Sequence, residues 1–301
     1  MQLSRAVLAL TLLAALAAPA ATAQSRFGPQ GGEAAPNREQ QWLVPSPDPD
    51  TAAHAVLFRP PGEGPFPLAL IAHASTQSAV RRALMPQPEY KVLSAWLVAR
   101  GFAVLVPERP GHGVTGGKYL EDQDGCDEAK YSRSGYATAD SIKAALRYLR
   151  GQPFIRPDGT IVVGHSAGAW GALALAAEDP KEIATIIAFA PGRGSDPNDF
   201  PNRVCAPHTL IASAAEFAED ARVPVLWLVA ANDSYFTPEL SRQMADAFRA
   251  GGGKVEFHVL PAAGSEGHWL AESTSGEKIF GPVLDRALKT AVANPASAKK
   301  R

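Results

Sequence analysis

Residues 160–178 read TIVVGHSAGAWGALALAAE, a segment with the pattern of a strand, a tight turn and a helix. It starts with four β-branched residues suited to a strand, and from Ala169 onward it is rich in helix-forming alanine and leucine. Gly164 and Gly168 flank Ser166 and permit a tight turn that lifts the serine hydroxyl above a sheet. A glycine-rich turn of this kind can also serve packing or anion binding at a helix N-terminus. The strand before it and the helix after it favour a turn that presents Ser166 as a nucleophile.

The rest of the chain alternates short apolar runs with segments of helical periodicity, the pattern of crossover units on a mostly parallel sheet. Strands are expected at residues 54–59, 68–73, 102–106, 161–164, 184–189, 223–229 and 255–260. Most are continuous apolar runs, as strands covered on both faces should be. Apolar residues repeat at helical spacing over residues 92–97, 142–149 and 240–248. The sequence therefore predicts an α/β fold with a mostly parallel central sheet and helices on both faces.

A serine hydroxyl is a poor nucleophile at neutral pH, so it needs a general base, and the base needs an acceptor that fixes its tautomer. When the serine lies on such a turn, the acid and the histidine follow it in that order. Asp233 directly follows one expected strand, and His268 lies in the loop after the last one. We therefore expect Ser166, Asp233 and His268 to form a catalytic triad. The alternative for Asp233 is a turn residue before the helix that starts near Pro238.

Acyl transfer also needs hydrogen-bond donors where negative charge develops. One donor is usually the amide of the residue after the nucleophile, here Ala167, and the other comes from the loop after an early strand. That loop begins at His73, and either Ala74 or Ser75 can supply its amide to this oxyanion hole. His73 is expected to orient the loop, and His165 is expected to pack or hydrogen-bond locally beside the turn.

Tyr235 and Trp269 flank the expected acid and base and are candidates for contact with the substrate, although aromatic residues there can equally belong to the core. No Cys, His and carboxylate residues cluster at a metal-binding spacing, so neither a metal nor a cofactor is expected. The 29 basic and 30 acidic residues create no field that would recruit nucleic acid or an anionic membrane. The expected partner is a small-molecule ester or related acyl substrate.

The two ends of the chain differ from its middle. Arg5 and the apolar run at residues 6–18, followed by Ala21-Thr22-Ala23, are typical of a secretory signal peptide. Export to the periplasm or beyond is therefore expected, and an uncleaved anchor is the alternative. The expected organisation is a signal peptide at 1–23, a flexible N-terminal segment at 24–52, one domain at 53–292 and a flexible basic tail at 293–301.

Two cysteines, Cys126 and Cys205, are an even number in a chain expected to be exported, so a disulfide is the economical interpretation. Two free buried thiols are the alternative. The cysteines lie in two irregular segments, 107–133 and 191–207, and both segments are expected at the carboxyl edge of the sheet. A disulfide there would join two loops over the crevice in which open α/β sheets bind ligands.

Several motifs in order resemble the dienelactone-hydrolase-like and prolyl-oligopeptidase-like branch of the α/β-hydrolases. They are RPPGEGPFP at 59–67, HAS at 73–75, ARGFAVLVP at 99–107, Gly164 to Gly168, Asn232-Asp233 and Gly267-His268. The resemblance spans about residues 53–288, and it implies an ester or related acyl substrate, no cofactor, and a triad of Ser166, Asp233 and His268. The true dienelactone hydrolases carry cysteine where this chain has serine, and prolyl oligopeptidases carry a β-propeller that this chain lacks. Neither family's own substrate can therefore be carried over.

The expected function is that of an exported serine hydrolase, which cleaves a carboxylic ester or related acyl bond through an acyl-enzyme. A small peptidase or amidase would use the same residues, and an acyltransferase would pass the acyl group to an alcohol where water is excluded. A non-catalytic binding protein is the alternative from another class, because a fold does not fix a function. The sequence sets neither the substrate nor the oligomeric state.

Overall fold

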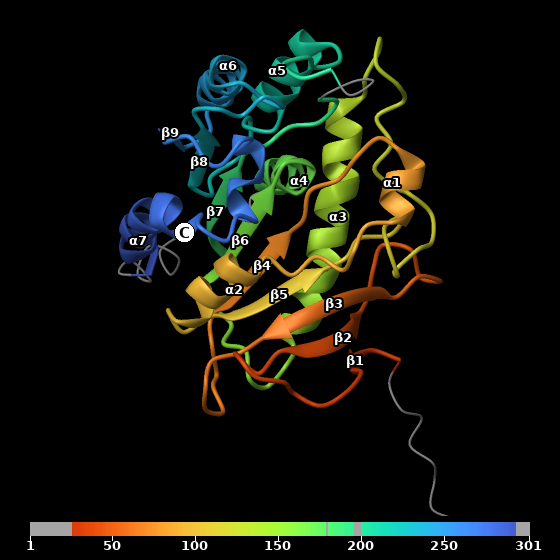
Figure 1. The fold of residues 1–301 in the computed structure, drawn as a ribbon, viewed down its shortest axis with the longest axis vertical. Helices are drawn as coiled ribbons and strands as arrows, with labels where there is room; N and C mark the ends of the chain where they lie inside the picture. The colour runs from red at the N-terminus through yellow and green to blue at the C-terminus, as the bar shows by residue number, and fades with distance from the viewer. Residues whose placement is uncertain (1–25, 179, 196–199, 293–301) are drawn as a thin grey trace, which may run out of the picture.

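The computed structural model describes residues 26–178, 180–195 and 200–292. Over these residues one sheet has the strand order β1-β2-β3-β5-β4-β6-β7-β8-β9 (Figure 1). The strands are β1 Gly28–Pro29, β2 Gln40–Val44, β3 Ala53–Phe58, β4 Leu68–Ala72, β5 Ala103–Pro107, β6 Thr160–His165, β7 Ile183–Phe189, β8 Val225–Ala230 and β9 Val255–Leu260. Strands β4 to β9 are parallel, whereas β1, β2 and β3 pair antiparallel. The predicted mostly parallel sheet is confirmed.

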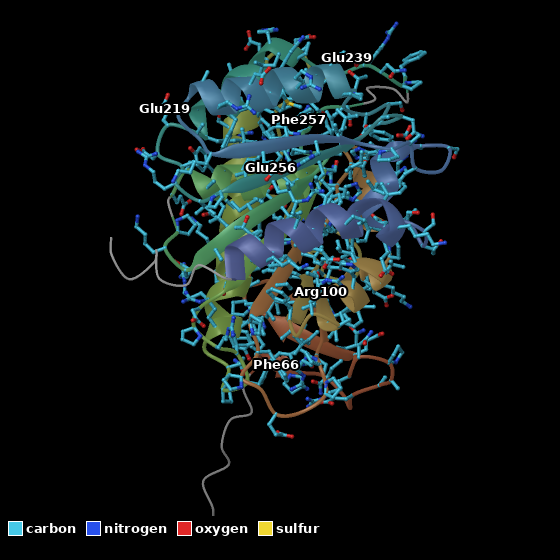
Figure 2. All side chains as sticks on the ribbon, turned by 90° about the vertical axis from the view of Figure 1, so that its left-hand side faces the viewer. Phe66, Arg100, Glu219, Glu239, Glu256 and Phe257 are labelled. Atoms are coloured by element: carbon cyan, nitrogen blue, oxygen red, sulfur yellow. A yellow bond between two sulfur atoms is a disulfide. The ribbon has the colours of Figure 1, made fainter. Side chains whose placement is uncertain are left out.

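Helices cover both faces of the sheet (Figure 1). They are α1 Ala79–Ala83, α2 Lys91–Val98, α3 Tyr131–Arg150, α4 Ala167–Ala176, α5 Pro207–Glu216, α6 Pro238–Ala250 and α7 Glu277–Val292, with a 3₁₀ helix, η2, at Gly267–Ala271. One buried cluster joins α3, α4, α5 and α6 to one face, and a second joins α2 and α7 to the other. At the second face lies Arg100, just after α2 (Figure 2), which pairs with Asp285 of α7 at 2.7 Å.

The strands predicted from the sequence are all present, with ends shifted by at most two residues. Their side chains alternate between the two clusters, as the pleat of a strand requires. In β6, for example, Val162 belongs to the first cluster, and Ile161 and Val163 belong to the second. A continuous apolar run is therefore what a strand between two helical layers needs.

The sheet begins earlier than the sequence predicts. The expected flexible segment at 24–52 contains β2, which pairs with β3 from Gln40 opposite Leu57 to Val44 opposite Ala53. Its alternation of buried and less buried residues covers only five positions, too few to stand out between proline-rich and glycine-rich stretches. The predicted domain boundary at residue 53 is therefore too late.

The predicted signal peptide at 1–23 and the predicted basic tail at 293–301 lie outside the described residues. Among the residues that are described, no helix combines the length and the apolar character needed to cross a membrane.

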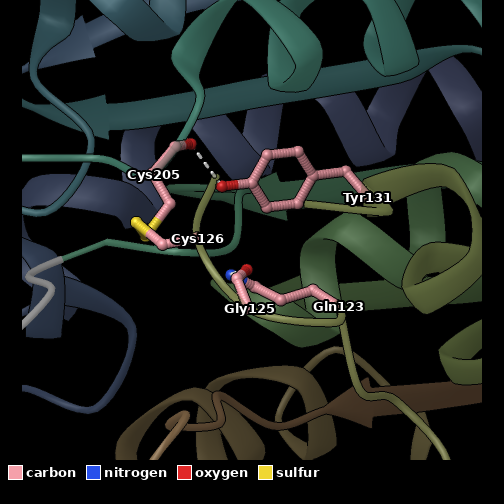
Figure 3. Close-up of a disulfide and its surroundings, with 5 residues drawn as sticks. All are labelled: Gln123, Gly125, Cys126, Tyr131 and Cys205. Atoms are coloured by element: carbon pink, nitrogen blue, oxygen red, sulfur yellow. Dashed lines mark hydrogen bonds between the residues drawn. A yellow bond between two sulfur atoms is a disulfide. The ribbon is translucent and has the colours of Figure 1, made fainter. Parts of the chain in front are cut away.

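A disulfide joins the irregular segments that follow β5 and β7. Cys126 in the first segment is bonded to Cys205 in the second, as the even cysteine count predicts (Figure 3). Tyr131, the first residue of α3, donates its hydroxyl hydrogen to the backbone carbonyl of Cys205. The two segments are thus tied covalently to each other and by a hydrogen bond to α3.

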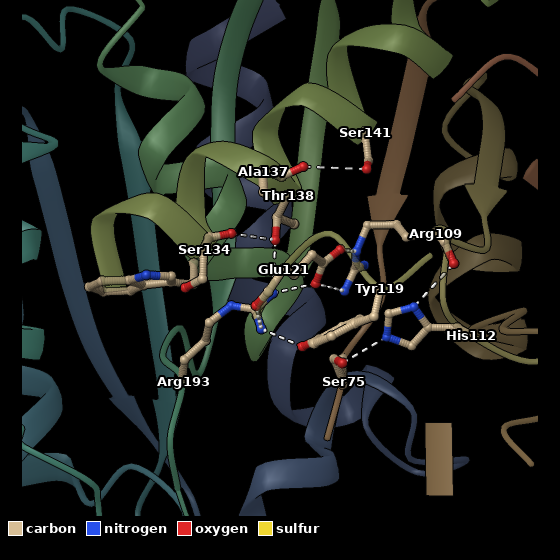
Figure 4. A network of polar contacts seen from close by, with 12 residues as sticks. Ser75, Arg109, His112, Tyr119, Glu121, Ser134, Ala137, Thr138, Ser141 and Arg193 are labelled. Atoms are coloured by element: carbon tan, nitrogen blue, oxygen red, sulfur yellow. Dashed lines mark hydrogen bonds and ion pairs between the residues drawn. The ribbon is translucent and has the colours of Figure 1, made fainter. Parts of the chain in front are cut away.

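A buried charge cluster of Arg109, Glu121 and Arg193 joins the same two segments (Figure 4). Each of the three side chains is at most 2% exposed, and Glu121 accepts hydrogen bonds from both guanidinium groups. Burial by itself raises the pKa of Glu121, but the two guanidinium groups outweigh it and hold the pKa well below 4.5. Arg193 also donates to Thr138 Oγ1 at 2.8 Å and to the Tyr119 hydroxyl at 3.1 Å.

We expect Glu121→Gln to lower the free energy of unfolding at pH 7 by about 3–5 kcal/mol, because it leaves two guanidinium groups buried without their counter-charge. Urea denaturation measures this loss. Exposed Glu128 of the same segment provides a matched control, since Glu128→Gln should change stability by less than about 0.5 kcal/mol. Because the native pKa of Glu121 is depressed, its contribution is present above about pH 4.5 and is lost as the pH falls through the native value. Equal stability of the two variants would contradict this account.

Candidate active site

Ser166 lies on the turn between β6 and α4, with φ 54° and ψ −120°. A positive φ is unfavourable for a residue other than glycine, so the packing around the turn must maintain it. A Cβ at Gly168 would lie 2.1 Å from the carbonyl oxygen of Ala72, and a Cβ at Gly164 would lie 2.3 Å from Ala169 Cα. Only glycine fits at these two positions. The paired glycines therefore let α4 start close against β4 and present Ser166 at the carboxyl edge of the sheet.

Asp233 and His268 come together from the loops that follow β8 and β9. Asp233 Oδ2 lies 3.2 Å from His268 Nδ1, and both side chains are at most 1% exposed. Asp233 Oδ1 accepts the backbone N–H groups of Tyr235 and Phe236, each at 2.9 Å. The carboxylate is thus fixed by two amides and faces the imidazole. A proton on Nδ1 leaves Nε2 of His268 as the basic nitrogen.

The loop that carries His268 is held from several sides. Glu266 accepts the backbone N–H of His268 at 2.9 Å and that of Ser234 at 3.1 Å, so one carboxylate joins the loops after β8 and β9. The ring of Tyr235 stacks on the imidazole of His268 with centroids 4.2 Å apart. Burial lowers the pKa of His268 below 6.5, and the hydrogen bond and charge of Asp233 partly offset that shift. The imidazole is therefore neutral at pH 7 and able to accept a proton.

A cavity of about 690 Å³ opens beside Ser166. Ser75, Ala167, Tyr235 and Trp269 line it, together with residues 85–92, which contribute Met85, Pro86, Pro88 and Val92. Cavities of this size and largely apolar character hold small-molecule ligands. Both aromatic candidates from the sequence, Tyr235 and Trp269, thus line this cavity. Trp269 is 41% exposed and Tyr235 is partly buried. No three His, Cys, Asp or Glu side chains of the described ranges are grouped so that they could hold a metal ion.

The candidate oxyanion residues lie on the walls of this cavity. Ala167 is the first residue of α4, where a backbone N–H has no acceptor within the helix. The N–H of Ala74 donates to the Tyr90 hydroxyl at 3.1 Å, and the Ser75 hydroxyl lies 2.7 Å from His112 Nε2. Ala74 and Ser75, the two alternatives for the second oxyanion donor, therefore have different surroundings.

The contacts of His165 extend beyond the local packing or hydrogen bonding that the sequence predicts. Its Nε2–H donates to the backbone carbonyl of His268 at 2.8 Å, and its Nδ1 lies 3.0 Å from the Tyr90 hydroxyl and 3.2 Å from Glu272 Oε1. The ring thus connects the His268 loop with Tyr90, which holds the amide of Ala74. A buried histidine needs polar partners, but these lie 75 to 107 residues away along the chain, so no local sequence pattern indicates them.

The chain belongs to the dienelactone hydrolase family, because the family model matches residues 84–274. None of the curated proteins compared with the sequence matches it.

Solved structures share the fold at low identity. Est1E from Butyrivibrio proteoclasticus has a TM-score of 0.55 and 16% identity over 84% of this chain and 99% of its own. The esterase Pf2001 from Pyrococcus furiosus has a TM-score of 0.58 and 16% identity over 84% and 90%. A candidate dipeptidyl aminopeptidase IV from Bacteroides ovatus has a TM-score of 0.60 and 12% identity over 84% and 35%. These likenesses establish the α/β-hydrolase fold, and with the family they make the chain a hydrolase of the carboxylesterase type.

We expect kcat/KM for an ester to be level from about pH 6.5 to 8 and to fall with one protonation below pH 6.5. In the role of general base that the sequence predicts, His268 acts as the neutral imidazole, and its depressed pKa keeps it neutral until the pH drops through that value. Asp233→Asn should move the inflection to still lower pH, because the carboxylate raises this pKa, and should reduce kcat by roughly 10⁴-fold. A pH–rate profile of both proteins measures this. An inflection above pH 6.5 in the unmodified protein would show that His268 is not the group that titrates.

Proposed function

We propose that this chain is an exported serine esterase in which Ser166 is the nucleophile, His268 the general base and Asp233 the acid that orients the base. The observation that carries the proposal is the buried Asp233–His268 pair, 3.2 Å apart, beside the strained turn of Ser166. Membership of the dienelactone hydrolase family supports the ester substrate.

The reaction would proceed through an acyl-enzyme. Ser166 Oγ attacks the ester carbonyl carbon while Nε2 of His268 takes the hydroxyl proton. The tetrahedral intermediate collapses, and His268 returns that proton to the departing alcohol. Water then attacks the acyl-enzyme, with His268 again as base, and releases the acid and Ser166. Asp233 stabilises the imidazolium formed in each half-reaction.

The amides of Ala167 and Ser75 are the proposed oxyanion donors. The Tyr90 hydroxyl occupies the N–H of Ala74 at 3.1 Å, which favours Ser75 over Ala74. Burial raises the pKa of Tyr90 well above 10, so the hydroxyl stays neutral and keeps this contact throughout the working pH range. Removing one oxyanion donor typically costs 10²- to 10³-fold in kcat.

The cavity favours esters with sizeable apolar groups. Its volume of about 690 Å³ exceeds the needs of an acetyl group, and Met85, Pro86 and Trp269 contribute apolar surface. Est1E has been determined with ferulic acid bound, so aromatic acyl esters also belong among the substrates to be tested.

The test is hydrolysis of a panel of p-nitrophenyl esters from acetate to octanoate, feruloyl esters and aminoacyl anilides. We expect turnover of esters, higher kcat/KM for the larger apolar acyl groups, and loss of activity in Ser166→Ala. A fluorophosphonate probe should label Ser166. Preference for anilides would indicate a peptidase or amidase, and transfer of the acyl group to an added alcohol in preference to water would indicate an acyltransferase. No turnover together with no labelling would favour a binding protein.

Export is proposed from residues 1–23, whose Arg5 and apolar run are typical of a signal peptide. We expect the protein, expressed with its native N-terminus in a Gram-negative host, to be recovered from the periplasmic or extracellular fraction. N-terminal sequencing of that protein should begin at Gln24. An intact Met1 on cytoplasmic protein would contradict the proposal.

A further inference from the structure

A second serine–histidine contact lies beside the proposed oxyanion hole, outside the triad. His112, in the segment after β5, is fully buried, and its Nε2 lies 2.7 Å from Ser75 Oγ (Figure 4). Its Nδ1 lies 3.1 Å from the carbonyl oxygen of Arg109 and 3.2 Å from that of Pro110. Carbonyl oxygens only accept hydrogen bonds, so Nδ1 of His112 carries a proton.

The charge state of His112 then fixes the direction of the contact with Ser75. Burial lowers the pKa of His112 to about 4, Glu121 partly opposes that shift, and Arg109 adds to it. The imidazole is therefore neutral at pH 7, and with its proton on Nδ1 it has a free lone pair on Nε2. The Ser75 hydroxyl must be the donor, so its hydrogen points at His112 and not into the cavity.

Arg109, in the same segment as His112, also holds His73, which lies two positions before Ser75. Arg109 donates its backbone N–H to His73 Nε2 at 3.0 Å and its guanidinium Nη1–H to the His73 carbonyl at 2.7 Å. The N–H of Ala74, between them, is held by Tyr90. Contacts from Arg109, Tyr90 and His112 thus hold three consecutive residues, His73, Ala74 and Ser75.

We propose that His112 is a positioning residue for the oxyanion hole: it holds the Ser75 hydroxyl and thereby fixes the direction of the Ser75 backbone N–H. The hydroxyl of Ser75 is an anchor and not itself an oxyanion donor. This proposal rests on the proposed function. An oxyanion donor acts on charge that develops only in the transition state. A small displacement of that donor therefore lowers kcat much more than it lowers the affinity for the substrate.

The experiment compares kcat and KM for p-nitrophenyl butyrate in Ser75→Ala, His112→Ala, the double variant and His112→Gln. Ser75→Ala and His112→Ala each remove the anchor and keep the Ser75 N–H, so we expect each to lower kcat about 10- to 100-fold with KM changed less than twofold. The double variant should be no slower than the slower single variant. His112→Gln offers an amide oxygen near the position of Nε2 and should recover most of the loss.

Three measurements separate positioning from a general structural role. The inhibition constant of a trifluoromethyl ketone, which forms a tetrahedral adduct with a reactive serine, should rise in parallel with the loss of kcat/KM. The affinity for a planar amide analogue should not change. His208→Gln, at an exposed position of α5, is the matched control and should leave both inhibitors and kcat unaffected.

The proposal is overturned by a large kcat loss in Ser75→Ala without one in His112→Ala, because the hydroxyl would then be a direct donor. Additive losses in the double variant, or full activity in Ser75→Ala, also overturn it. If His112→Ala does not fold, Ser75→Ala and His112→Gln decide the question. Failure of the proposed function can be told apart from failure of the His112 proposal, because Ser166→Ala would then retain the esterase activity.

Discussion

The backbone of Ser166 adopts a strained conformation on the turn between β6 and α4. Its φ of 54° costs about 1–3 kcal/mol, and the surrounding structure must supply that energy. All residues of β6 and α4 are buried, the N–H of Ser166 donates to Phe189 of β7 at 2.9 Å, and the N–H of Trp170 donates to the Ser166 carbonyl at 2.9 Å. The strained turn is thus held between two buried elements and a neighbouring strand. It points the serine at the edge where the loops after β4, β8 and β9 converge.

Those loops are irregular, and polar contacts hold them to one another. Glu266 joins the loops after β8 and β9, and His165 joins the last loop to Tyr90. Arg109 holds the loop after β4, and Glu121 in turn holds Arg109. A charge or polar group buried without its partner is costly, so these contacts favour one arrangement of the loops. The positions of the proposed catalytic groups therefore follow from these polar contacts between the loops.

The sequence predicts this fold well where buried strands and helices leave a regular pattern of apolar residues. The central strands are apolar on both faces and can therefore be recognised in the sequence, and the order Ser166, Asp233, His268 places the triad candidates in the segments after β6, β8 and β9. Strand β2 was missed because its alternation is too short. The roles of His112 and of the Arg109–Glu121 pair were missed because they depend on contacts across long separations, such as 37 residues between Ser75 and His112. Choosing between Ala74 and Ser75 required the position of the Tyr90 hydroxyl, which no local pattern encodes.

The most direct test of the account is a crystal structure of the protein after reaction with a fluorophosphonate. We predict phosphorus bonded to Ser166 Oγ, with its non-bridging oxygen within hydrogen-bond distance of the N–H groups of Ala167 and Ser75, and with the Tyr90 hydroxyl still on Ala74. Phosphorus on another residue would contradict the assignment of the nucleophile. An oxygen bound by the Ala74 amide, with Tyr90 displaced, would contradict the assignment of the oxyanion hole.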